Sequence, residues 1–165
     1  MLFGHSDKHS YNNRIKDATN LYLPPDTINN YAYRRLFRGC TSLTGAPILR
    51  STSTATGCYN EMFWGTKITK VKIDATSLVN SCMYDSMTFV DTLSAVEVAT
   101  MSNISWSSIG NFYNHMSSTG IMIRPYGSST PEIKSDWTVL DRRSDGLLYS
   151  TNGTRYTGED PFPRS

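Results

Sequence analysis

The feature that most constrains this chain is a pattern that recurs at intervals of about 25 residues, within the range typical of stacked repeat architectures. Triplets of the form apolar-x-apolar end at positions 23, 49, 73, 98 and 123, and these position numbers rise in steps of 26, 24, 25 and 25. Leu43, Ile68 and Leu93 follow the same spacing. The sequence therefore predicts a solenoid with one turn of chain per repeat.

The repeat predicts two kinds of element. Each triplet is expected to be a short parallel strand whose outer two residues point inward and whose middle residue points outward. Between triplets, apolar residues spaced three and four apart predict short helices at residues 28–38 and 55–64, ending at Gly39 and Gly65. The expected fold is an α/β repeat with an N-terminal segment 1–19, a solenoid with its C-terminal cap 20–140, and a hairpin and tail 141–165.

Several motifs within the repeats resemble a known family. The segments "YAYRRLF", "CTSLTGAP" and "GCYNEMFWG", with "ATSLVNSC" and the closing "SDWTVLD", are similar to BspA-like leucine-rich repeats of gut bacteria and their phages. The similarity covers Asn20 to about Leu140. It implies a non-catalytic protein–protein interaction module, first of all a phage virion component such as a head decoration, fibre or tail accessory protein. The alternative is a fragment of a bacterial cell-surface adhesin.

The repeat geometry nominates one surface for interaction. The middle residues of the five triplets should form a ladder on one sheet face: Tyr22, Ile48, Lys72, Glu97 and Met122. Lys72 and Glu97 would be cross-strand neighbours. The partners expected for this face are other subunits of an assembly, with a host surface protein or a glycan as further candidates. A merely solvated sheet face is the other interpretation.

The repeat ends before Asp141. The turn sequence "SDG" predicts a hairpin between Trp137–Leu140 and Leu147–Ser150. Near the C-terminus, Phe162 lies between Pro161 and Pro163, a shape suited to the groove of a partner. We expect this tail to dock on a neighbouring subunit.

Composition argues against several other functions. The 16 basic and 14 acidic residues are scattered, and the net charge of +2 does not predict nucleic-acid binding. No stretch is long and apolar enough to predict a membrane span. The first residues, "MLFGHSDKHS", lack the pattern of a signal peptide, so we expect no export signal.

Motifs for chemistry are sparse. Cys40, Cys58 and Cys82 suggest neither a disulfide framework nor a zinc site, and we expect them to be reduced. His5 and His9 have the four-residue spacing that can hold a metal, but no third ligand is marked nearby, so a solvated terminus is the other interpretation.

The remaining candidates also have two interpretations. The carboxylates belong to different repeats, and only a pair assembled across turns of the solenoid would support glycosidase chemistry. The basic cluster either binds an acidic partner or forms an exposed helix face; it consists of Arg34, Arg35 and Arg38. The sequence predicts no enzyme, no metal and no cofactor.

Overall fold

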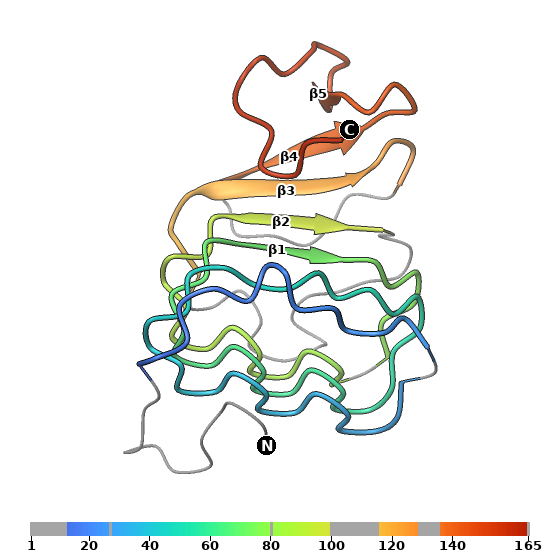
Figure 1. Ribbon diagram of the computed structural model, residues 1–165. Helices are drawn as coiled ribbons and strands as arrows, with labels where there is room; N and C mark the ends of the chain where they lie inside the picture. Colours follow the sequence, from blue (N-terminus) through green and yellow to red (C-terminus); the bar gives the residue numbers. More distant parts are fainter. Residues whose placement is uncertain (1–12, 27, 80, 100–115, 129–135, 165) are drawn as a thin grey trace.

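The strands of this protein form one sheet (Figure 1). The computed structural model describes residues 13–26, 28–79, 81–99, 116–128 and 136–164. Five strands lie side by side in chain order: β1 (Lys70–Ile73), β2 (Ala95–Val98), β3 (Gly120–Pro125), β4 (Trp137–Arg142) and β5 (Leu148–Ser150). Strands β1 to β4 are parallel, and β5 pairs antiparallel with β4.

Three of the five predicted strands are confirmed. The two predicted nearest the start of the chain are not formed as strands. The triplets that end at residues 73, 98 and 123 lie in β1, β2 and β3. The second triplet contributes one isolated parallel bridge, between Leu49 and Ile73. The first triplet, residues 21–23, carries no strand. The hairpin predicted after the repeat is confirmed, since Leu140 pairs with Ser150 and Arg142 with Leu148.

The predicted helices at 28–38 and 55–64 are wrong. The described residues contain no helix, and these two segments, like residues 81–89, are successions of turns. Their backbone N–H groups alternate between two kinds of partner. The N–H of Arg34 donates to Tyr31 three residues back at 3.2 Å, whereas the N–H of Tyr33 donates across to Cys58 at 2.8 Å. Every amide along residues 31–40 follows this alternation, so the backbone is satisfied without a helix.

The turns repeat every four residues. Positive φ angles occur at Tyr31, Arg35 and Gly39, at Gly57, Glu61 and Gly65, and at Ser81, Asp85 and Phe89. The first members of these three sets are at positions 31, 57 and 81, so the sets follow the spacing of the repeat. A four-residue period is close to the 3.6 residues of a helical turn, so the spacing of apolar residues indicates a helix almost equally well. This coincidence explains the incorrect prediction.

The core lies between these turn segments and the sheet (Figure 1). Matching side chains from successive segments stack on one another. The rings of Phe37 and Phe63 are 5.7 Å apart and nearly parallel, and those of Tyr33 and Tyr59 are 6.1 Å apart. Cys58 and Cys82 are fully buried at corresponding positions, and all three cysteines are free, as predicted. Burial raises the pKa of the Cys40 thiol to about 11 and that of Cys82 to about 12.

Candidate binding surface

The sheet has an inner face toward the core and an outer face on the opposite side. Val71, Val96 and Met122 are partners in register on β1, β2 and β3, and all three belong to the core. Side chains alternate between faces along a strand, so the next residues, Lys72, Glu97 and Ile123, lie on the outer face. Leu140 of β4 is the register partner of Ile123 and continues this row.

The position expected for Met122 is wrong. Met122 is only 1% exposed and packs in the core, because β3 pairs one residue out of the expected register. The register pairs Val71 with Val96, as the repeat requires, but it pairs Val96 with Met122, one position later than the repeat requires. A shift of one residue moves a side chain to the other sheet face. Ile123 therefore takes the outward place that the repeat assigned to Met122.

The other four predicted positions have very different exposures. Tyr22 is 61% exposed, and the guanidinium of Arg50 lies 5.3 Å from the centre of its ring. Ile48 and Lys72 are half-buried, and Glu97 is buried. Lys72 and Glu97 are cross-strand neighbours, as predicted. Their charged groups bond elsewhere, Lys72 to Asp74 and Glu97 to two arginines.

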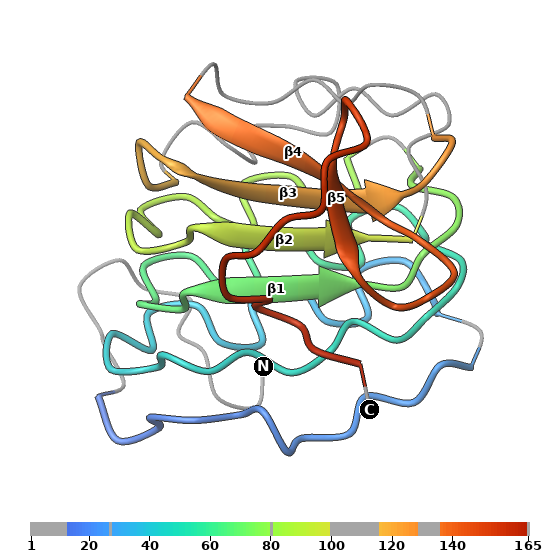
Figure 2. The ribbon, with the colours of Figure 1, turned by 90° about the horizontal axis from the view of Figure 1, so that it is seen from above.

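The tail, defined here as residues 151–164, lies over the outer face of the sheet. Figure 2 shows it running from β5 back across the sheet toward β1. Phe162 and Tyr156 pack on a second apolar cluster, separate from the core, that is formed by Ile123, Leu140 and Leu148. We expected Phe162, with Pro161 and Pro163, to occupy a partner's groove. In the structure Phe162 is half-buried against its own sheet, while Pro163 is exposed.

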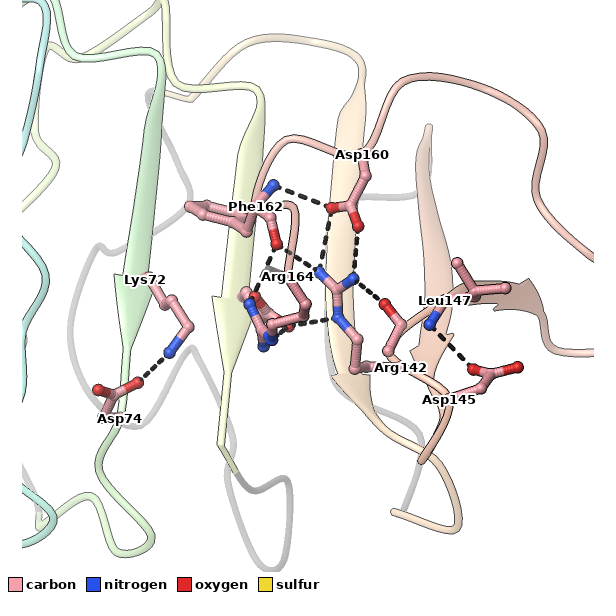
Figure 3. Close-up of polar contacts among 10 residues, drawn as sticks. Lys72, Asp74, Arg142, Asp145, Leu147, Asp160, Phe162 and Arg164 are labelled. Atoms are coloured by element: carbon pink, nitrogen blue, oxygen red, sulfur yellow. Dashed lines mark hydrogen bonds and ion pairs between the residues drawn. The ribbon is translucent and has the colours of Figure 1, made fainter.

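Arg142 at the end of β4 fastens the tail to the sheet (Figure 3). Its Nη1 and Nη2 both donate to the carboxylate of Asp160, and Nη2 also donates to the carbonyl of Phe162 at 3.1 Å. Its Nε donates to Glu97 at 3.0 Å and Nη1 to the carbonyl of Gly146 at 2.8 Å. Burial alone would raise the pKa of Asp160, but hydrogen bonds from Arg142 and from the N–H of Phe162 lower it overall.

The last residues of the tail also make polar contacts with β1 and β2. Lys70 on β1 donates to the carbonyl of Pro161 at 2.7 Å, and its Nζ lies 5.6 Å from the centre of the Phe162 ring. Arg164 donates to Glu97 at 2.7 Å. The sequence predicted a docking tail but did not identify these polar anchors. The signal that was available is the run Ile121–Ile123, because a strand that is apolar at consecutive positions is covered on both faces.

A pocket of about 150 Å³ opens beside this tail, at the ends of β1, β2 and β3. Its charged walls are Lys72, Asp74, Glu97, Arg142 and Arg164, and its apolar walls are Ile73, Val98, Ala99 and Pro125. Figure 3 shows Lys72 and Asp74 on one side and Arg164 on the other. The side chain of Glu97 is 5% exposed.

The basic cluster on the turn segments differs from a plain exposed face. Arg34 is exposed and donates to Asn60 at 3.2 Å, and Arg35 forms an ion pair with Glu61. Arg38 is only 3% exposed and lies over the ring of Trp64 at 4.3 Å. All three arginines therefore contact the next turn segment, and Arg38 is buried there.

Within the described ranges, no group of three or more His, Cys, Asp or Glu side chains is placed to hold a metal ion. His5, His9 and His115 lie outside the described residues. The part of the chain that the structure describes has no helix of the length and apolar character that crossing a bilayer requires.

Comparison with protein-family models, with curated proteins and with solved structures finds no match to this chain.

Proposed function

We propose that this chain is a short leucine-rich-repeat-like solenoid that works as a non-catalytic binding module. The cross-segment hydrogen bonds support a solenoid, because residues 31–39 donate to residues 56–64, and residues 59–65 donate to residues 82–88. The parallel register of β1 with β2, in which Lys70 pairs with Ala95 one repeat later, supports the same interpretation. Successive turns of a solenoid present an extended surface, and such surfaces serve binding.

The observation that carries the proposal is the contrast between the two parts of the outer face. The tail covers the part from β4 to β1, whereas Tyr22 is 61% exposed on the segment before β1, with Arg50 against its ring. Tyrosine and arginine are among the residues that most often dominate binding energy at interfaces. Tyr22, Ile48 and Arg50, which we call the open strip, are therefore the proposed contact surface.

The first candidate for the biological role is a structural or attachment component of a phage virion, located in the particle. It rests on the resemblance of the repeats to BspA-like sequences of bacteria and phages. The second candidate is a bacterial cell-surface adhesin. It is favoured by the packing of Phe162 on its own sheet, since a tail that has already found its groove gives no reason for docking on a neighbouring subunit.

Fractionation tests the two roles directly. An antibody against the purified chain is used to follow the protein through density gradients of a source culture, in which phage particles and cell envelopes separate. Sedimentation with particles supports the virion component, and sedimentation with envelopes supports the adhesin. Free protein in neither fraction would contradict both proposals.

A variant pair tests the surface. Tyr22→Ser should weaken binding to the particle or envelope about tenfold or more, because it removes an exposed aromatic anchor. Tyr84→Ser is the matched control, since Tyr84 is 44% exposed and lies on a turn segment away from the sheet. Equal loss in both variants would contradict the assignment of the open strip.

A further inference from the structure

The pocket beside the tail contains an unsatisfied buried anion. Oε1 of Glu97 accepts from Arg142 at 3.0 Å and from Arg164 at 2.7 Å. Oε2 of the same carboxylate is shielded from solvent and accepts no hydrogen bond from any described residue. A buried polar atom without a partner is costly, and for a charged group the cost is larger. A hydrogen-bond donor at Oε2 would remove this cost.

The pocket is large enough for more than a single water molecule. One buried water needs roughly 10–15 Å³ of such space. The pocket volume of about 150 Å³ is on the order of ten times that minimum. A small organic group therefore fits. A single bridging water would leave most of the pocket empty.

The charges of the walls select a neutral ligand. Three cationic walls, Lys72, Arg142 and Arg164, face two anionic ones, Asp74 and Glu97. Asp160, which pairs with Arg142, brings the local sum to zero. A cation would face three positive side chains and an anion two negative ones. A neutral group that both donates and accepts hydrogen bonds meets neither repulsion.

We propose that this pocket binds neighbouring hydroxyl groups of a neutral sugar, with Glu97 as the acceptor for one hydroxyl. The inference rests on the proposed binding function and adds the ligand class. A second hydroxyl accepts from the ammonium of Lys72, which bonds to Asp74 through one of its three possible donors. Ala99 and Pro125, which are half-buried, offer apolar contact to the C–H groups of the ring.

Arg164 acts as the movable wall of this site. Its side chain is 41% exposed, whereas that of Glu97 is 5% exposed. When Arg164 turns outward, the carboxylate of Glu97 loses one of the two donors at Oε1, and a hydroxyl of the ligand can take that place while Glu97 keeps its hydrogen bond from Arg142. Arg164 lies outside β4 and β5, so its movement leaves the pairing of these two strands unchanged.

The test uses the full chain and a panel of methyl glycosides of neutral hexoses at millimolar concentration, measured by NMR. At least one glycoside should shift the methyl signal of Ala99, which lines the pocket, more than those of Leu43, which lies in the core away from the pocket. Glu97→Gln should weaken this binding about tenfold or more, because a hydrogen bond to a charged acceptor is replaced by a weaker one. Arg164→Ala should bind at least as tightly as the natural chain.

Glu61→Gln is the matched control. Glu61 is half-buried and, like Glu97, pairs with two arginines, Arg35 and Arg38, but it lies on the turn segments. This variant should bind the glycoside normally. If Glu97→Gln does not fold, Lys72→Met provides the second variant and should lose several-fold in affinity.

Three outcomes would overturn the proposal. They are no methyl shift with any glycoside, binding that is equally strong in Glu97→Gln, and preferential binding of acetate or methylammonium over every glycoside. These outcomes are separable from failure of the proposed function. Loss of particle or envelope binding in Tyr22→Ser without any glycoside binding would retain the function and reject the pocket. Glycoside binding by a protein found in neither fraction would retain the pocket and reject the proposed function.

Discussion

Replacing Gly57 by alanine distinguishes the turn segments from the helix that the sequence indicates. In a helix interior, glycine to alanine stabilises by roughly 0.5–1 kcal/mol. In the structure Gly57 has a φ of 61°, and a left-handed conformation costs an L-residue about 1–2 kcal/mol. The two backbone conformations therefore predict effects of opposite sign at the same residue.

The packing adds to the loss at this position. A Cβ on Gly57 would clash with the ring of Tyr31, so that ring must move. Tyr31 is 53% exposed and can turn away, which keeps this steric part small. In a Tyr31→Ala background the steric part disappears, and a loss of about 1–2 kcal/mol should remain. Gly65→Ala, where φ is 74° and nothing lies near the added Cβ, should show a similar loss.

Chemical denaturation followed by circular dichroism measures these changes. In thermal unfolding of a chain of this size, each kcal/mol lost from the free energy of unfolding should lower the melting temperature by about 2–4 °C. The reciprocal change, Ser81→Gly, places glycine at the corresponding position of the third segment, where φ is 64°, and should stabilise the protein. Stabilisation by Gly57→Ala together with destabilisation by Ser81→Gly would refute the turn structure and restore the helix.

Three further predictions concern the tail and the core. Arg142→Met should cost about 3–5 kcal/mol and expose the tail to protease, because it leaves Glu97 and Asp160 without their shared partner. An unchanged melting temperature would contradict the role of Arg142. Since the folded pKa of Asp160 is lowered, its contribution to stability should be complete above roughly pH 4 and be lost at lower pH. Protease sensitivity of the tail that is constant from neutral pH to pH 3 would argue against this. The buried thiols, with the pKa of Cys40 raised to about 11, should resist a thiol reagent at pH 8 and react only after unfolding. Full labelling of the folded protein would show that these cysteines are accessible.

The strand positions were largely predictable because they depend on a local pattern. Alternating apolar residues at a fixed spacing place Val71, Val96 and their neighbours on the inner face of parallel strands. The hairpin of β4 and β5 was predictable for a similar reason, since its turn is encoded in adjacent residues. The candidate surface was predicted only in part, because Tyr22 is exposed but Glu97 is buried beneath the tail.

The sequence by itself determined the spacing of the strands, the inward residues of β1 and β2, and the reduced cysteines. Only the tertiary structure decided between helix and turns, because amides such as that of Tyr33 bond to a neighbouring segment that a local pattern does not describe. It also decided the face of Met122, since register is fixed by pairing between strands and one residue of shift exchanges the faces. The tertiary structure also decided where Phe162 packs. Arg142 and Lys70, which are distant in sequence, provide the contacts that hold the tail on its own sheet.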